Sequence, residues 1–382
     1  MTETDTPDVT DSPDVTDTPD ATGSPDMTDS PRVLVAGETL VDLVAPDEPM
    51  VTADAFDARV GGAPANVAAG LAALDEPAWL WTRVGEDGFG ERCRRTLDAH
   101  GVPDRFVEVD AERETTVAFA ARETAGDDDL AFTFYRGADR HLGESAGPSE
   151  TGVPDDEGAT DPVDALDGVD VVVVGGIALA SEPARSAVLD LARAAADADC
   201  TLVFDPNARP AAWPDDDFQT VTEQVLALAD VVKATPADLA AAGFDVASIT
   251  PGADDTEPRP ASAPALAEAV CERGPHTTFL TLGSDGAAAA STHRSPFGRG
   301  GATHHGYDVD AVDPTGAGDA FLAAVVAELA TGATDPYAIL DVATATGALA
   351  TTNPGALPSL PDRDAVDALV ADDSIGGDGG GA

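Results

Sequence analysis

Basic residues are scarce in this sequence, and acidic residues are in large excess. Its 382 residues include 20 Lys and Arg against 71 Asp and Glu, which gives a formal net charge of −51. A charge of this sign disfavours nucleic acid and anionic membranes as partners. The acidic residues are spread along the chain, as is typical of proteins that work in concentrated salt, where screening relieves self-repulsion. We therefore expect a salt-loving source, since an acidic protein that meets basic partners usually carries its charge in blocks.

Long apolar runs and cysteine motifs are also lacking. The longest apolar segments, 169–180 and 320–330, are too short to cross a bilayer, and no early stretch joins a basic start to an apolar run. We expect a cytoplasmic protein with no membrane partner. The cysteines have no CxxC spacing and predict buried free thiols at Cys93, Cys200 and Cys271.

Both ends of the chain have a composition that cannot form a core. A Pro-Asp pair recurs at positions 7, 13, 19 and 25, so residues 1–31 are predicted to be a disordered acidic tail. Residues 372–382 are rich in Gly and Asp and are predicted to form a second loose tail. The folded body is then 32–371, and with 43% apolar residues overall it can bury one large core or two smaller ones.

Within that body, apolar strand-like runs alternate with alanine-rich helical ones, as in 33–37 followed by 65–74. The alternation indicates βαβ units, and strands that are almost continuous Val and Leu indicate an α/β fold whose mostly parallel sheet is covered on both faces. Two segments, roughly 39–60 and 106–137, contain strand patterns without helices between them. They predict a small antiparallel β-sheet that projects from the main body as a lid.

The most informative motif is Asp313-Pro-Thr-Gly-Ala-Gly-Asp-Ala-Phe321, which precedes an apolar helix. Gly316 and Gly318 leave backbone amides free at the start of that helix, where the amides and the helix dipole favour an anion such as phosphate. Asp319 would repel a phosphate that was only bound, but a base beside a travelling phosphoryl group explains its position. The alternative is a tight turn with Asp319 as the helix N-cap.

A second glycine turn, Gly61-Gly-Ala-Pro-Ala-Asn-Val-Ala-Ala-Gly70, also leads into a helix. Gly61 and Gly62 allow a ligand to approach the backbone, and Asn66 offers a donor and an acceptor to a sugar hydroxyl. An ordinary helix entry with a solvated Asn66 fits the pattern at least as well.

Polar residues follow several predicted strands at their carboxyl ends, where parallel sheets bind ligands. Asp205, Asn207 and Arg209 follow the strand 201–204, although an Asp-Pro-Asn turn bonded to its own backbone is an alternative. Lys233 is the only lysine of the chain and also follows a strand, which suggests a phosphate ligand. The alternative is one surface lysine retained by chance. Residues 281–286 close a further strand and could pass under a nucleotide, but alone they indicate only a turn.

Together these segments resemble the PfkB family of carbohydrate kinases from about residue 33 to 369. The N-terminal signature of that family is similar to 61–70, accompanied here by 85–90, and the C-terminal signature is similar to 313–321. The resemblance implies a ribokinase-like three-layer α/β sandwich with a mostly parallel central sheet and a small β-sheet lid. It also implies ATP and a small-molecule sugar as substrates, Mg²⁺ as cofactor and K⁺ as a further candidate.

The same resemblance assigns roles to individual residues. Asp319 matches the catalytic base, and the anion hole matches Gly316, Ala317 and Gly318. The sugar hydroxyls are expected near Asp42, Gly61, Gly62 and Asn66. The nucleotide side is expected near Lys233, Thr281, Gly283, Gly286 and Asn353. Thr235 and Asp238 stand where the family usually has Asn or Ser and then Glu, close to the phosphates and magnesium.

A finer resemblance points to the fructokinase branch of the family. It rests on the pattern 37–42, on Pro64, on the segment 134–139 and on the segment 205–213. Tyr135 and Arg136 are expected to reach the sugar from the lid. Kinases of 2-keto-3-deoxygluconate share the Tyr-Arg and Asp-Pro-Asn-x-Arg features but usually have an acidic residue at the position of Pro64. Fructose is therefore favoured, with 2-keto-3-deoxygluconate as the alternative. A nucleoside kinase, a non-catalytic sensor and a homodimer formed through the lid stay open.

Overall fold

The computed structural model describes residues 30–122, 130–144, 161–213, 217–246 and 263–376. The contacts within the chain divide it into two units between Ser30 and Pro31, and the described residues belong almost entirely to the second. The predicted acidic tail lies almost wholly outside the described residues. No described helix is long and apolar enough to cross a membrane.

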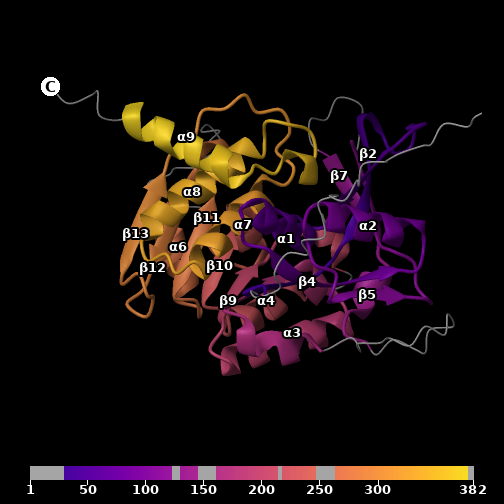
Figure 1. The fold of residues 1–382 in the computed structure, drawn as a ribbon, viewed down its shortest axis with the longest axis horizontal. Coiled ribbons are helices and arrows are strands. Elements are labelled where there is room, and N and C mark those ends of the chain that lie inside the picture. The colour runs from indigo at the N-terminus through magenta and orange to yellow at the C-terminus, as the bar shows by residue number, and fades with distance from the viewer. Residues whose placement is uncertain (1–29, 123–129, 145–160, 214–216, 247–262, 377–382) are drawn as a thin grey trace, which may run out of the picture. The chain divides into compact units, whose positions relative to one another are not determined.

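Nine of the described strands form one sheet in the order β13-β12-β11-β10-β9-β8-β1-β4-β5 (Figure 1). Neighbouring strands run parallel except at β12, which is antiparallel to both of its neighbours. The strands are β1 (Val33–Ala36), β4 (Ala78–Gly85), β5 (Val107–Asp110), β8 (Val171–Gly175), β9 (Thr201–Asp205), β10 (Val231–Ala234), β11 (Thr277–Thr281), β12 (Ala287–Ser291) and β13 (Gly300–His304). The predicted mostly parallel sheet is confirmed.

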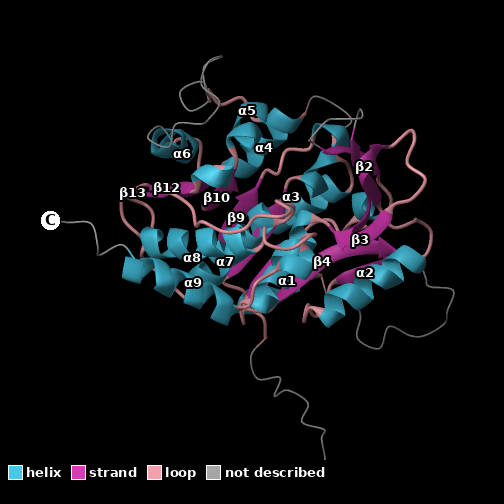
Figure 2. Ribbon diagram, turned by 90° about the horizontal axis from the view of Figure 1, so that it is seen from above, coloured by secondary structure: helices cyan, strands magenta, loops and turns pink. Residues whose placement is uncertain are grey.

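Helices cover both faces of this sheet. Successive side chains of a strand point to opposite faces, and the buried strands are apolar on both faces, so each face needs a helix layer. In β1, Val33 and Val35 belong to one core, whereas Leu34 and Ala36 belong to the other. Figure 2 shows the two helix layers on either side of the strands. The first layer contains α1 (Ala63–Ala73), α2 (Gly88–Ala99), α7 (Ala317–Ala330), α8 (Pro336–Leu349) and α9 (Arg363–Gly376), and the second contains α3 (Ala184–Asp197), α4 (Phe218–Leu226), α5 (Pro236–Ala241) and α6 (Ala263–Cys271).

A second, four-stranded sheet forms the lid, with the order β3-β2-β6-β7. Its strands are β2 (Leu40–Pro49), β3 (Asp57–Gly61), β6 (Val117–Arg122) and β7 (Leu130–Tyr135). The prediction of an antiparallel sheet is wrong for its central pair, because β2 and β6 run parallel. Both strands continue from parallel strands of the main sheet, β1 and β5, and therefore enter the lid in the same direction. The predicted lid segment 106–137 also includes β5, which pairs with β4 in the main sheet instead.

The C-terminal boundary differs from the prediction as well. Helix α9 continues to Gly376, beyond the predicted end of the folded body at residue 371. Val366 of this helix is buried in the core. Once a helix has formed, each added residue contributes one further hydrogen bond, so the helix can continue beyond its last core contact. Polar composition alone therefore placed the end of the body too early.

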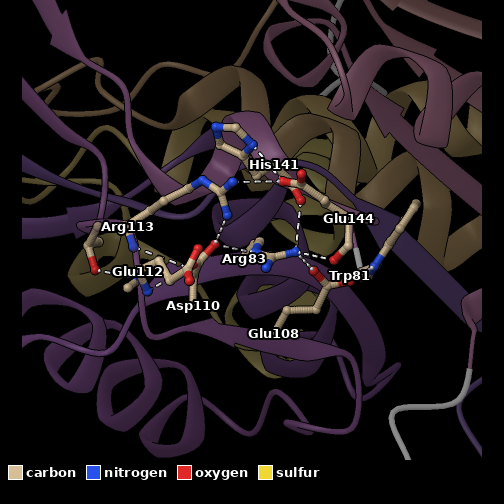
Figure 3. Close-up of polar contacts among 10 residues, drawn as sticks. Trp81, Arg83, Glu108, Asp110, Glu112, Arg113, His141 and Glu144 are labelled. Atoms are coloured by element: carbon tan, nitrogen blue, oxygen red, sulfur yellow. Dashed lines mark hydrogen bonds and ion pairs between the residues drawn. The ribbon is translucent and has the colours of Figure 1, made fainter. Parts of the chain in front are cut away.

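A buried arginine network joins the edge of the main sheet to the segment that follows the lid (Figure 3). Arg83 of β4 donates to Asp110 at 2.9 Å and to Glu108 at 3.1 Å. It also donates to the carbonyls of His141 at 2.8 Å and Glu144 at 2.5 Å. Since a buried guanidinium requires acceptors for its N–H groups, these bonds fix the segment 141–144 against the sheet.

Candidate active site

The site is built where the N-termini of α1 and α7 meet. The two helices touch at Gly70, where a Cβ would lie 2.8 Å from the Cβ of Ala323, so a residue with a Cβ does not fit there. One turn closer to each N-terminus lie Asn66 and Asp319, on the same helix faces as these two residues. Asn66 Nδ2 donates to Asp319 Oδ2 at 2.8 Å. The close helix packing thus places the amide of Asn66 against the carboxylate.

Two free amides lie at the start of α7, in the same helix turn as Asp319. Gly316 is the N-cap in the left-handed conformation, with φ of 84°, and a Cβ there would lie 2.5 Å from the Cβ of Ala356. The amide of Ala317 already donates to the carbonyl of Pro314 at 3.2 Å. The amides of Gly316 and Gly318 form no hydrogen bond within the described part of the chain. Of the three predicted anion-hole amides, these two are therefore the available donors.

Asp319 does not cap the helix, so the N-cap alternative is wrong. It lies in the first turn of α7, and its carboxylate accepts from a side chain of α1. Burial raises the pKa of Asp319, while the charge of Lys233, the hydrogen bond from Asn66 and the charge of Arg209 each lower it. A carboxylate with a raised pKa is a stronger base than an ordinary one.

Lys233 and Asp205 form a buried ion pair beneath the anion hole. Lys233 Nζ lies 3.0 Å from Asp205 Oδ2, and a Cβ at Gly318 would lie 3.1 Å from the same nitrogen. Burial by itself would lower the pKa of Lys233, but the carboxylates of Asp205, Asp319 and Asp238 raise it, so the ammonium stays charged. The interpretation of Lys233 as a surface lysine is therefore wrong.

Asp205 also forms the predicted local turn, because its Oδ1 accepts from the amide of Asn207 at 3.1 Å. The predicted turn alternative is thus observed, and the other carboxylate oxygen of Asp205 pairs with Lys233. Asn207 adopts a positive φ of 39°, and Arg209, two residues further along the chain, is exposed. The charge of Arg209 acts on both Asp319 and Asp42.

The lid contributes Asp42 from β2. A Cβ at Gly61 would lie 2.4 Å from Asp42 Oδ2, so the glycine leaves room for the carboxylate. Burial raises the pKa of Asp42 to about 6, with Arg59 and Arg209 lowering it and Asp319 raising it. The structure therefore brings the predicted residues of the lid, of α1 and of α7 into one charged neighbourhood.

Glu38 is a site residue that our sequence analysis did not assign. It lies two residues after the end of β1 and is 1% exposed. Its carbonyl requires glycine at position 62, where φ is 105° and a Cβ would lie 2.5 Å from the carbonyl oxygen. Glu38 Oε1 accepts from the amide of Ala63 at 3.3 Å, but Oε2 and the Oδ1 of Asn66 find no hydrogen-bond partner among the described residues. Burial raises the pKa of Glu38 to about 8; the charge of Arg136 lowers it, and Asp139 and Asp319 raise it. The strand-end rule that selected Asp205 could have found this residue.

Tyr135 does not join the other predicted residues in the site. The strand register places Phe134 on the same face of the lid as Asp42, and Tyr135 on the opposite face. There Tyr135 is 60% exposed, and its ring centroid lies 5.6 Å from that of Phe119. The prediction that Tyr135 contacts the sugar is therefore wrong for the site of its own chain.

Thr235 and Asp238 form a capping box at the N-terminus of α5. Asp238 Oδ2 accepts from the amide and the hydroxyl of Thr235 at 2.8 and 2.7 Å, and Oδ1 accepts from the amide of Ala208 at 2.7 Å. Both oxygens of this buried carboxylate are used by the protein, so Asp238 fits poorly as a direct ligand of magnesium. No cluster of three or more His, Cys, Asp or Glu suited to a metal ion occurs in the described residues.

The predicted nucleotide positions lie at the end of β11 and beside the anion-hole segment. Thr281 ends β11, and Gly283 and Gly286 follow in a turn with φ of 65° and 83°. A Cβ at Gly286 would lie 2.1 Å from the carbonyl of His304, so this turn requires glycine. Asn353 is exposed in a loop whose Thr351 carbonyl accepts from the amides at 312 and 313, at 2.7 and 3.0 Å.

Over most of its length, the chain is similar to known proteins. A family model described as pfkB family carbohydrate kinase matches residues 30–363. A fructokinase from Klebsiella pneumoniae is 33% identical over 341 residues, covering 87% of this chain and 97% of that protein. The crystal structure of a fructokinase from Xylella fastidiosa with bound ATP has a TM-score of 0.71 at 23% identity, covering 90% of this chain and 100% of that one. A fructokinase double mutant from Vibrio cholerae O395, bound to fructose, ADP and potassium, has a TM-score of 0.67 at 25% identity, covering 90% and 99%.

Proposed function

The chain belongs to the pfkB family of carbohydrate kinases, and on that premise we propose that this ATP-dependent sugar kinase phosphorylates fructose. It shares the ribokinase-like fold. Similarity to fructokinases supports this acceptor. Pro64 supports it as well, because kinases of 2-keto-3-deoxygluconate usually have an acidic residue at this position. The ring of Pro64 packs on the ends of β1 and β8, where a Cβ at Gly37 or Gly175 would lie 2.4 or 2.9 Å from its Cγ. The alternative acceptor is 2-keto-3-deoxygluconate.

One observation carries the proposed chemistry: the Asp319 carboxylate is held by Asn66 beside the unbonded amides of Gly316 and Gly318. Asp319 accepts the proton of the sugar hydroxyl while the amides stabilise the charge on the γ-phosphoryl group. The ammonium of Lys233, which is paired with Asp205, lies next to Gly318. The phosphoryl group passes directly to the sugar oxygen, with no covalent enzyme intermediate.

Magnesium is proposed to enter with the phosphates of ATP. Since both oxygens of Asp238 are bonded to the protein, we assign no residue of this chain as its direct ligand. A magnesium ion bound to substrate phosphates commonly keeps several waters. The potassium ion in the Vibrio cholerae complex makes K⁺ a candidate second cofactor.

The lid is proposed to close over the sugar and exclude water, which suppresses hydrolysis of ATP. Asp42 on its inner face would then bind sugar hydroxyls. The outer face carries an aromatic cluster. The ring centroid of Phe119 lies 5.3 Å from that of Phe56 and 5.6 Å from that of Tyr135. This partly exposed cluster is a candidate surface for the predicted homodimer.

A substrate panel tests the acceptor. ADP formation should be measured with fructose, 2-keto-3-deoxygluconate, ribose and adenosine, in concentrated KCl and again in NaCl. Fructose should give the highest kcat/KM. A higher value for the sugar acid or the nucleoside would contradict the proposal, and binding of sugar and ATP without turnover would indicate a sensor. A rate that falls in NaCl would identify potassium as a cofactor.

A further inference from the structure

The guanidinium of Arg136, at the base of the lid, is already bonded to protein groups. Its Nε donates to Asp139 Oδ2 at 2.8 Å, and its Nη2 lies in ion-pair contact with the same oxygen at 2.7 Å, although Nη2 makes no hydrogen bond among the described residues. Its Nη1 donates to the carbonyl of Ile177 at 3.0 Å. The side chain is only 7% exposed. A guanidinium held on two sides in this way has little charge to offer a further anion.

Asp139 is fixed as firmly as the arginine it holds. Its second oxygen accepts from the hydroxyl of Thr116, which in turn accepts from the amide of Gly137 at 2.7 Å. Asp139 lies in the short helix η1 (Ala138–His141), and the segment after it is anchored by Arg83 (Figure 3). Both oxygens of the buried carboxylate are thus used, and the backbone that carries it is pinned to the main sheet. The fold holds Arg136 in place before any substrate arrives.

The charges that remain near the sugar are predominantly negative. Asp42 and Asp319 lie within electrostatic reach of each other, and the charge of Asp319 helps to raise the pKa of the neighbouring Glu38. Arg209 already acts on both Asp42 and Asp319, and Arg59, which acts on Asp42, also lies 3.6 Å from Asp313. A neutral sugar offers hydroxyl donors to these carboxyls, whereas a sugar acid adds one more negative charge and therefore needs a free cation.

We propose that Asp139 is a specificity-determining residue that restricts the acceptor to neutral sugars, because it withdraws Arg136 from any carboxylate of the substrate. This inference rests on the proposed function and deepens it by naming the substrate class. It follows the general rule that specificity is gained by disfavouring the wrong ligand as well as by binding the right one. Loss of the Asp139 charge would free the Arg136 guanidinium beside Glu38, where it could pair with the carboxylate of a sugar acid.

The test compares kcat/KM for fructose and for 2-keto-3-deoxygluconate in the parent and in Asp139→Asn, which keeps the size of the side chain. The ratio of sugar acid to fructose should rise about tenfold or more, mainly through a lower KM for the acid. The double variant Asp139→Asn with Arg136→Ala should lose this gain. Asp190→Asn is the matched control, because Asp190 pairs with Arg193 at the same spacing but is 74% exposed, so the ratio should not change.

The parent protein provides a second measurement that does not depend on the folding of any variant. 2-Keto-3-deoxygluconate, tested as an inhibitor of fructose phosphorylation, should have an inhibition constant about tenfold or more above the KM for fructose. An inhibition constant at or below that KM would overturn the inference, and so would a folded Asp139→Asn variant with the parental ratio. Failure of the parent to phosphorylate any sugar would instead refute the proposed function.

Discussion

Glu38 places a buried carboxyl beside the catalytic centre, and this burial makes the stability of the fold depend on pH. The pKa of Glu38 rises from 4.5 to about 8 on folding. Between these values the folded state holds more protons than the unfolded state, so the free energy of unfolding falls as pH rises, by at most about 1.4 kcal/mol per pH unit. Glu38→Gln cannot titrate, and this contribution should disappear from it.

Denaturant unfolding of the parent and of Glu38→Gln at pH 6 and pH 8 measures the effect. The variant should gain stability relative to the parent as the pH increases. Glu272→Gln is the control, since Glu272 is exposed, and it should follow the parent at both pH values. The same pH dependence in Glu38→Gln and the parent would show that the carboxyl is ionised throughout.

Single residues also show how far sequence reasoning extends. The grouping of Asp319, Asn66 and Lys233 could be anticipated, because each stands at a helix start or a strand end that the α/β topology directs to one edge. Tyr135 could not be placed in this way. Successive residues of a strand point to opposite faces, so the choice between Phe134 and Tyr135 depends on the register of β7 with β6, which the sequence alone did not establish.

At the scale of elements, the contact of α1 with α7 controls the geometry of the base. Gly70→Ala would place a Cβ 2.8 Å from that of Ala323 and force the helices apart. The Asn66–Asp319 hydrogen bond, one turn away, should then lengthen. We expect stability to fall by about 1–3 kcal/mol, as in other overpacked cores, and kcat to fall with it.

Thermal unfolding and steady-state kinetics of Gly70→Ala test this expectation. The double variant Gly70→Ala with Ala323→Gly should recover both properties, because it returns the lost space from the opposite helix. Gly88→Ala is a suitable control, since nothing lies within 4 Å of a Cβ at that position. Parental stability and kcat in Gly70→Ala would mean that the helices can separate without cost.

The lid shows why elements are easier to predict than their pairing. Its strand patterns were recognisable from the sequence, but the direction of β6 relative to β2 is set by the strands that precede them, β5 and β1. The pattern around residues 107–110 has the same alternation as a lid strand, although β5 completes the edge of the main sheet. Local periodicity identifies a strand and does not say which sheet it joins.

For the whole molecule, the dominant property is the net charge of −51. Repulsion among so many carboxylates destabilises the compact state, and salt shortens the reach of that repulsion from about 10 Å at 0.1 M to about 3 Å at 1 M. We therefore expect the midpoint of thermal unfolding to rise by more than about 5 °C between ~0.1 M and ~2 M KCl. NaCl should raise the midpoint equally, because screening does not distinguish the two cations. An unchanged midpoint would contradict the expectation of a salt-adapted protein.

The layered architecture was predictable because buried parallel strands are almost continuous runs of apolar residues, which few other elements are. Runs such as Val171–Gly175 are apolar on both faces and require helices on each side. The end of the last helix was not predictable in the same way. Its final residues are polar, and their helical conformation continues from a core contact at Val366 that composition does not reveal.

The central claim is that the carboxylate of Asp319 removes the proton from the acceptor hydroxyl. The most direct measurement is the rate of phosphoryl transfer from ATP to fructose by Asp319→Asn, with the binding of both substrates measured by calorimetry. We expect kcat to fall by about 10²–10⁴-fold while both substrates still bind, because the amide keeps the shape of the carboxylate but cannot accept the proton. A kcat within about tenfold of the parent would contradict the assignment of Asp319 as the base.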